Sequence, residues 1–179
     1  INELTDEEMN RVASKGTETV LSEISENCKI IFPSTHVVFE GKDTLVRDIK
    51  EDYEIFPVLP YAVGKTKNEE QIKKSGKNYV ILRLGSVYGY STDTTRLNIM
   101  PNLFSKITSQ NGTIKLFAGG KQLKCLAPLF DVVRCFKFME EKDDIKFETF
   151  HLSKDSVTVK QVAEICKKIN PKAKIEKTS

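Results

Sequence analysis

The sequence has few of the residues that mark metal sites, disulfide frameworks and membrane spans. Its two histidines, His36 and His151, have no neighbours at metal-ligand spacing, and its four cysteines form no close pair. The sequence therefore predicts no metal site, and reduced thiols rather than a disulfide framework. No apolar run approaches the roughly 18 residues that cross a bilayer, and residues 1–10 are acidic and polar, unlike a signal peptide. We expect a cytoplasmic protein with no membrane association.

The sequence also lacks an excess of charge of one sign. The formal net charge is +3, and the 28 basic and 25 acidic residues are scattered along the chain. Because nucleic-acid-binding domains carry clustered basic residues, we expect no nucleic-acid partner. A length of 179 residues allows one compact domain, or part of one, with its own hydrophobic core.

Hydrophobic periodicity in the first half of the chain predicts alternating helices and strands. Apolar or small residues recur at three- and four-residue steps over residues 9–24, as in an amphipathic helix. Short apolar runs at 29–33 and 79–84 predict buried parallel strands, and Pro33 should stand at the end of the first. A second helix is expected between them, over residues 61–75. The order strand, helix, strand predicts an α/β fold with a parallel crossover.

The second half of the chain is also predicted to contain both helices and strands. The glycine-bounded stretch 85–89 is expected to be a loop. Thr158 and Gln161 have the spacing of a capping box, which predicts the start of a last helix that ends before Pro171. The other expected elements are helices at 97–109 and 129–141 and strands at 113–117 and 147–152.

One pair of residues has the spacing of an acid/base group. Tyr61 and Lys65 lie four positions apart in a predicted helix, so their side chains should emerge from one face. An ammonium beside a phenol favours the phenolate and makes tyrosine usable near neutral pH. The spacing alone is weak evidence, because Tyr61 could simply pack its ring while Lys65 is solvated. Thr35 follows a predicted strand and could hold a reacting hydroxyl, or could be an ordinary strand-end threonine.

These residues lie within four sequence blocks that occur in a characteristic order. They are Gly16-Thr17-Glu18-Thr19-Val20-Leu21, Phe32-Pro33-Ser34-Thr35-His36-Val37-Val38-Phe39-Glu40-Gly41, Tyr61-Ala62-Val63-Gly64-Lys65 and Leu82-Arg83-Leu84-Gly85-Ser86-Val87-Tyr88-Gly89. In this order they resemble the extended short-chain dehydrogenase/reductase family, whose members include nucleotide-sugar epimerases and dehydratases.

The resemblance implies a partial Rossmann fold, a doubly wound parallel sheet, with part of a small C-terminal substrate-binding lobe. Residues 1–95 would form the C-terminal half of the Rossmann domain, with the Thr/Tyr/Lys site. Residues 96–179 would form mostly the substrate-binding lobe, with a strand near 147–152 that returns to the sheet. The nine glycines include no Gly-x-Gly-x-x-Gly motif, so the half that holds the cofactor pyrophosphate would be missing. We therefore expect these 179 residues alone to be inactive.

The resemblance also implies roles for particular residues. Tyr61 would be the catalytic acid/base, and Lys65 would lower its pKa and bind the nicotinamide ribose, so both contact the cofactor. Thr35 would hold the substrate hydroxyl. Further substrate contacts are implied at three positions, the last two beside the nucleotide diphosphate: Ser86, Asn98 and Lys124.

The function that follows is an NAD-dependent 4-epimerase of a nucleotide sugar, with NADP not excluded. A dehydratase or a reductase would keep the same Tyr-Lys pair, but a dehydratase usually has acidic residues beside the threonine. Here the neighbours are Ser34 and His36, which favours an epimerase. A non-catalytic nucleotide-binding homologue is the alternative from another class. The resemblance further implies a homodimer through the helices at 9–24 and 61–75.

Overall fold

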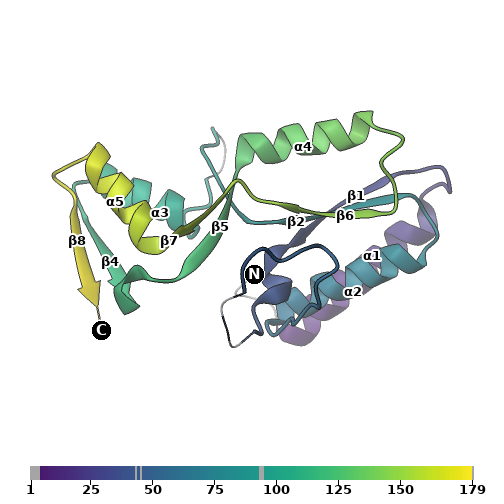
Figure 1. Ribbon diagram of the computed structural model, residues 1–179. Helices are drawn as coiled ribbons and strands as arrows, with labels where there is room; N and C mark the ends of the chain where they lie inside the picture. The colour runs from purple at the N-terminus through teal and green to yellow at the C-terminus, as the bar shows by residue number, and fades with distance from the viewer. Residues whose placement is uncertain (1–4, 43, 45, 93–94, 179) are drawn as a thin grey trace. The chain divides into compact units, whose positions relative to one another are not determined.

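The computed structural model describes residues 5–42, 44, 46–92 and 95–178. Contacts divide the chain into an N-terminal unit, Ile1–Leu84 with Cys135–Leu152, and a C-terminal unit, Gly85–Arg134 with Ser153–Ser179. The elements of Figure 1 are α1 (Asp6–Glu23), β1 (Ile30–Thr35), η1 (His36–Phe39), α2 (Pro60–Lys74), β2 (Tyr79–Leu84), β3 (Ser86–Tyr88), α3 (Met100–Ser109), β4 (Thr113–Phe117), η2 (Ala118–Gly120), β5 (Leu123–Pro128), α4 (Leu129–Glu141), β6 (Glu148–Leu152), β7 (Asp155–Thr158), α5 (Val159–Ile169) and β8 (Lys174–Thr178).

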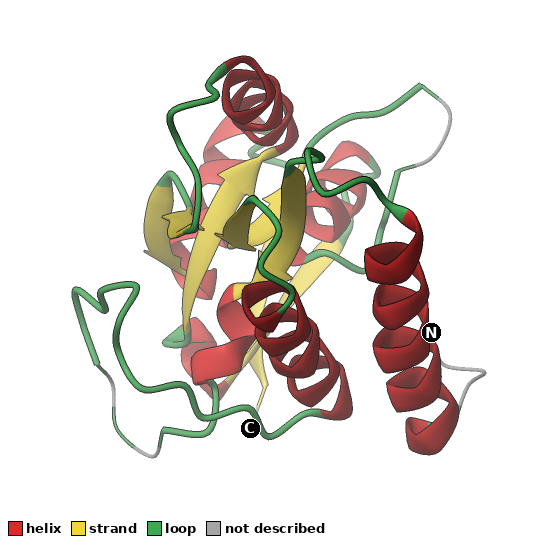
Figure 2. Ribbon diagram, turned by 90° about the vertical axis from the view of Figure 1, so that its right-hand side faces the viewer, coloured by secondary structure: helices red, strands yellow, loops and turns green. Residues whose placement is uncertain are grey.

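The N-terminal unit is built on a parallel sheet with the strand order β1-β2-β6. Figure 2 shows the strands between helices. Successive side chains of β2 point to opposite faces of the sheet. Val80 and Leu82 are fully buried on one face, where they pack against Met139 of α4. Arg83 points to the other face, where it meets Glu69 of α2. The α/β class with parallel strands is therefore confirmed.

Helices α1 and α2 pack closely through small and polar side chains. A Cβ on Gly64 of α2 would lie 3.5 Å from the Cβ of Ala13 of α1, which is ordinary contact distance. The Asn68 side chain donates to the Ala13 carbonyl at 2.9 Å, and the Gln71 side chain donates to the Ser14 carbonyl at 3.1 Å. These bonds from side chain to backbone fix the position of α2, the helix that carries the predicted site residues.

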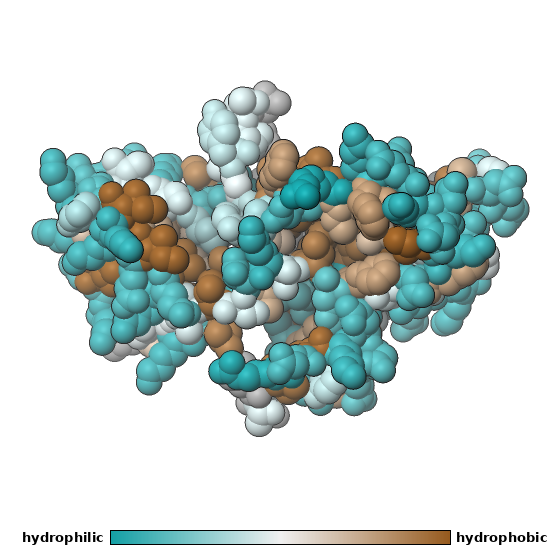
Figure 3. Space-filling model, turned by 45° about the horizontal axis from the view of Figure 1, so that its top comes forward, coloured by the Kyte–Doolittle hydropathy of each residue, from teal (hydrophilic) through white to brown (hydrophobic). Residues whose placement is uncertain are grey.

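The surface is mixed in polarity. On the face drawn in Figure 3, hydrophobic side chains are interspersed among hydrophilic ones. In the part of the chain that the structure describes, no helix is long and apolar enough to cross a membrane. The same residues contain no group of three His, Cys, Asp or Glu side chains that could hold a metal ion.

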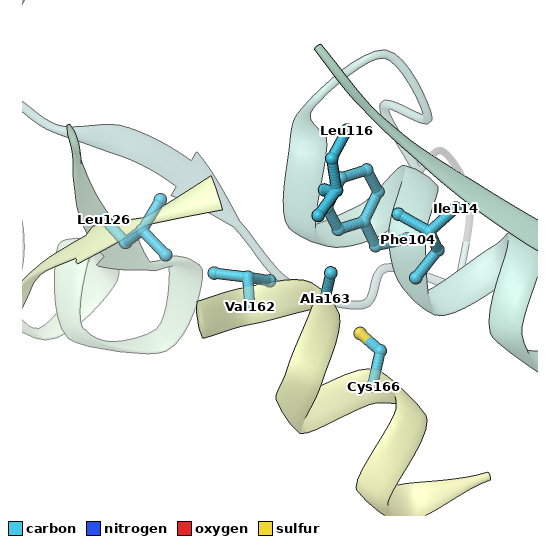
Figure 4. Packing of buried hydrophobic residues seen from close by; sticks show 7 residues of the cluster. All are labelled: Phe104, Ile114, Leu116, Leu126, Val162, Ala163 and Cys166. Carbon is cyan, nitrogen blue, oxygen red and sulfur yellow. The ribbon is translucent and has the colours of Figure 1, made fainter. Parts of the chain in front are cut away.

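The C-terminal unit has its own apolar core. In one sheet β5 pairs with β3 in parallel and with β7 antiparallel, and in another β4 pairs with β8 in parallel. Thr158 and Gln161 form the predicted capping box at the start of α5. Figure 4 shows how α5 packs its apolar face onto side chains from α3, β4 and β5. The cluster comprises Phe104, Ile114, Leu116, Leu126, Val162, Ala163 and Cys166.

The first strand was predicted wrongly at its end. Pro33 does not end the strand, because β1 continues to Thr35. Among the described strands, β2 is the one that pairs with β1. The Ile30 N–H at the start of β1 faces β2, because it donates to the Asn78 carbonyl at 2.8 Å. Backbone groups alternate along a strand, so those of Pro33 face away from β2, and the Pro33 carbonyl accepts from Lys65. Proline therefore costs no ladder hydrogen bond at this edge.

The second half contains further corrections. The stretch 85–89, expected to be a loop, contains the short strand β3, and the helix expected from residue 97 begins at Met100. The predicted division near residue 95 lies inside the C-terminal unit, which begins at Gly85. The strand expected at 147–152 corresponds to β6, which pairs with β2 of the N-terminal sheet.

Candidate functional site

Tyr61 and Lys65 stand on the first two turns of α2. Pro60 occupies the first turn of the helix, where its missing N–H costs nothing. Tyr61 is the next residue, and it is 45% exposed, so solvent can reach its side chain. One turn later the ammonium of Lys65 lies 5.9 Å from the centroid of the Tyr61 ring. The structure thus brings this predicted pair together on one face of the helix.

Lys65 connects α2 to the end of β1. Its Nζ donates to the Pro33 carbonyl at 2.7 Å and lies 4.6 Å from the centroid of the Phe32 ring. Burial among these groups lowers the pKa of Lys65, and the carboxylate of Glu69 acts in the opposite direction. An ammonium has three donors, and one of them is used by Pro33.

Thr35 is the last residue of β1, two positions beyond the carbonyl that Lys65 binds. It is 6% exposed, and its Oγ1 accepts from the backbone N–H of Val37 at 3.2 Å, which caps η1. A hydroxyl that accepts one bond can still donate its own hydrogen. The structure therefore places a threonine hydroxyl at the carboxyl end of a parallel strand, where ligands bind in open α/β sheets.

Arg83 and Glu69 form a buried ion pair next to the end of β1. Arg83 donates to Glu69 through Nε (3.1 Å) and Nη2 (2.8 Å), and both side chains are at most 4% exposed. The Ser34 hydroxyl donates to the same carboxylate. Sequence reasoning missed Glu69, although two signals pointed to it. It follows Lys65 by four residues on the same helix, and a lone arginine in the apolar run of β2 needs a buried partner.

The loop between η1 and α2 is held to the sheet by Glu51. Its backbone carbonyl accepts from Arg83 at 3.0 Å, and its carboxylate accepts from the backbone N–H of His151 at 3.0 Å. The second bond lowers the pKa of Glu51. His151 itself packs edge-on against Phe39, with ring centroids 5.4 Å apart, and burial lowers its pKa. No signal in the sequence identified Glu51.

His36 has a structural contact. Its Nδ1 lies 2.9 Å from the Leu84 carbonyl. Because a carbonyl can only accept, Nδ1 must carry the hydrogen in this bond. The contact ties the start of η1 to the end of β2 and so gives His36 a structural role beside Thr35.

The other predicted substrate contacts lie in the C-terminal unit. Ser86 begins β3 and pairs in register with Leu126, and Lys124 stands two positions before Leu126 on the neighbouring strand β5. Asn98 is exposed, and its Oδ1 accepts from Arg96 Nε at 2.8 Å. Ser86 and Lys124 are half-buried, so all three are available at a surface.

Comparison with solved structures identifies proteins with the same fold. A UDP-glucose 4-epimerase of Thermotoga maritima, solved with UDP-glucose, superposes with a TM-score of 0.80 at 21% identity, over 95% of this chain and 58% of that one. A UDP-glucuronic acid 4-epimerase of Bacillus cereus, solved with UDP-glucuronic acid and NAD, gives 0.79 at 22% identity over 96% and 55%. A UDP-glucose 4-epimerase of Thermus thermophilus with NAD gives 0.75 at 17% identity over 92% and 56%.

The chain therefore spans little more than half the length of these structures, and identities this low establish the fold alone. A search of curated protein sequences found no match. The family model described as the RmlD substrate binding domain matches residues 2–177. Together with the fold, this match supports the resemblance to the extended short-chain dehydrogenase/reductase family, and the chain belongs to the RmlD substrate binding domain family.

Proposed function

We propose that this chain supplies the acid/base site of an NAD-dependent 4-epimerase of a nucleotide sugar. One observation carries the proposal. The Lys65 ammonium lies 5.9 Å from the centroid of the Tyr61 ring and also donates to the Pro33 carbonyl in β1, the strand that ends at Thr35. A phenol, an ammonium and a hydroxyl on these adjoining elements suit the removal of a proton from a sugar hydroxyl. The relatives of known structure, which bind UDP-sugars and NAD, support the same substrate class.

Each residue of the site has a defined task in this reaction. Thr35 accepts or donates a hydrogen bond to the substrate hydroxyl and holds it in position. Tyr61 takes the hydroxyl proton as general base and gives it back as general acid. Lys65 keeps its positive charge beside the phenol and so favours the phenolate.

The site fits the nicotinamide end of NAD. Lys65 uses one of its three donors on Pro33, and the other two suit ribose hydroxyls. Bound there, NAD would accept a hydride from the sugar carbon and return it. The sequence contains no glycine-rich loop for the cofactor pyrophosphate, so that contact is expected from residues outside these 179.

Two further features complete the proposal. Ser86, Asn98 and Lys124 would bind the nucleotide part of the substrate, with the last two beside its diphosphate. The protein would form a homodimer through α1 and α2. In support of this, α1 buries none of its described residues within the chain and exposes Val12 and Val20 by 57% and 55%.

The function is tested with the full-length protein, NAD and UDP-glucose or UDP-glucuronic acid deuterated at C4. We expect interconversion of the C4 epimers with the deuterium retained, because hydride leaves and returns to the same carbon. Formation of a dehydrated keto sugar would instead identify a dehydratase. In a parallel reaction with NADH and a keto nucleotide sugar, stoichiometric consumption of the reduced cofactor would identify a reductase. Nucleotide binding without turnover would indicate a non-catalytic homologue, and each of these three results would overturn the epimerase assignment.

A further inference from the structure

Glu69 is a charged side chain in a place where charge is costly. It is 2% exposed, on the face of α2 that packs against the sheet. A buried carboxylate is tolerated only when it is paired and hydrogen-bonded. Here it accepts two bonds from Arg83 and one from Ser34. Replacing a buried ion pair of this kind by apolar residues is often neutral or stabilising, so stability alone does not account for it.

The first consequence of Glu69 concerns the end of β1. Ser34 is 3% exposed, and its hydroxyl donates to Glu69. The next residue is Thr35, at the carboxyl end of the strand. Since Ser34 is held through its side chain, the peptide unit that leads to Thr35 is also held. Glu69 therefore restrains the position of the threonine hydroxyl without touching it.

The second consequence concerns Lys65, one turn before Glu69 on α2. Burial disfavours the ammonium, and the negative charge of Glu69 favours it. The other titratable or charged groups around Glu69 and its partner are Tyr61 and Lys73 on α2, Arg83 on β2, Glu51 in the loop before α2 and His151 on β6. Of these groups, Glu69 is the one whose charge acts on Lys65, and it favours the ammonium.

We propose that Glu69 is a positioning residue for the acid/base site, which holds the Thr35 end of β1 in place and sets a negative charge one helical turn from Lys65. The proposal rests on the proposed function, because it assigns Glu69 a task in the same site. It also has a readout that does not need turnover, namely the titration of Lys65 itself.

The test uses the double variant Glu69→Leu/Arg83→Met in the full-length protein. Removing both partners avoids an unpaired buried charge, so this variant should fold even if single variants do not. Glu70→Gln is the matched control, since it removes one negative charge from the adjacent residue, whose side chain is 60% exposed and pairs with Lys74. NMR of protein with ¹³C-labelled lysine reports the ionisation of Lys65, and the pH profile of kcat reports its effect on catalysis.

Glu69→Gln removes the negative charge and keeps an amide oxygen for Ser34 and Arg83, so we expect Lys65 to titrate at a lower pH in this variant than in the wild type. In the double variant the loss of the Arg83 cation offsets part of this shift, and we expect kcat to fall by roughly ten- to hundredfold, as for a misplaced catalytic group. Glu70→Gln should leave both unchanged. An unchanged Lys65 titration in Glu69→Gln would overturn the electrostatic part of the proposal, and a wild-type kcat in the folded double variant would overturn the positioning part. If Lys65 shifts as expected but the wild type has no activity on nucleotide sugars, the proposed function fails while the effect of Glu69 stands.

Ser34→Ala tests the restraint on β1 separately. It removes the bond from β1 to Glu69 and leaves the ion pair with Arg83 intact. We expect kcat to fall by about tenfold, as a small misplacement of Thr35 would cause, with the Lys65 titration unchanged. Wild-type kcat in this variant would overturn the restraint of β1 by Glu69.

Discussion

The two units of this chain keep polar groups in their interiors to different degrees. The N-terminal unit buries several polar and charged side chains, and among the described residues of the C-terminal unit Thr108 alone belongs to this class. Those of the N-terminal unit are Ser34, Thr35, Asn68, Glu69, Lys77 and Arg83. The C-terminal unit is instead stabilised by the apolar cluster around Leu116 (Figure 4). The buried polar groups of the N-terminal unit lose their hydration, which costs free energy. In return they hold the groups around Thr35 and Lys65 in a fixed arrangement.

The largest effect on stability should come from breaking the buried ion pair on one side only. Arg83→Met leaves the Glu69 carboxylate buried without its cationic partner and the two bonds from it, and we expect a loss of about 3–5 kcal/mol. Amide hydrogen exchange of β2 measures this loss within the N-terminal unit. The double variant Glu69→Leu/Arg83→Met should restore much of the protection. Equal losses in the single and double variants would contradict the interpretation of an uncompensated charge.

In the C-terminal unit, the corresponding test is a substitution that opens a cavity in the apolar core. Leu116 is 1% exposed and packs in the cluster with Phe104. Leu116→Ala should cost about 2–5 kcal/mol, because the removed methyl groups leave a void that the core fills only in part. Exchange rates of amides in β4 and β8 should rise, while those in β2 provide the control. A loss below about 1 kcal/mol would show that this core is not well packed.

A smaller effect is expected from pH. Burial holds the pKa of His151 below its usual value of 6.5. The unfolded chain therefore binds more protons than the folded one in this window, so stability is complete above about pH 6.5 and decreases as pH falls through the folded pKa. Protection of amides in β6 should decrease between pH 7 and 5.5, and His151→Gln should reduce that dependence. Glu51, whose pKa lies below 4.5, acts only at lower pH. An equal pH dependence in the variant would exclude His151 as its cause.

The sequence predicted several helices and strands well, because each of them has a strong local signal. The apolar run at 79–84 matches β2, and the capping box at Thr158 starts α5. The strands that it missed have weaker patterns. β8 (Lys174–Thr178) is mostly charged and polar, and β5 (Leu123–Pro128) contains a lysine and ends in proline. Their pairing with β4 and β3 depends on contacts between residues distant in sequence.

The candidate site was predictable to the extent that it depends on spacing. A spacing of four residues on a helix brings two side chains to one face, and in the structure the Lys65 ammonium lies beside the Tyr61 ring. The partners of the buried charges were not predicted. Glu69 meets Arg83 only when α2 packs on the sheet, and Glu51 meets His151 only after β6 pairs with β2. The position of Glu69 on α2 gave a partial signal, whereas the contact of Glu51 with His151 has no local pattern.

The central claim is that Tyr61 performs the proton transfer, and Tyr61→Phe in the full-length protein tests it most directly. Removing a general acid/base typically costs 10²–10⁴ in rate, so we expect kcat to fall at least a hundredfold while NAD and UDP-sugar still bind. Tyr90→Phe, which removes the same hydroxyl from a side chain that is 82% exposed in the C-terminal unit, should leave kcat unchanged. Turnover of Tyr61→Phe within a few-fold of the wild type would contradict the account.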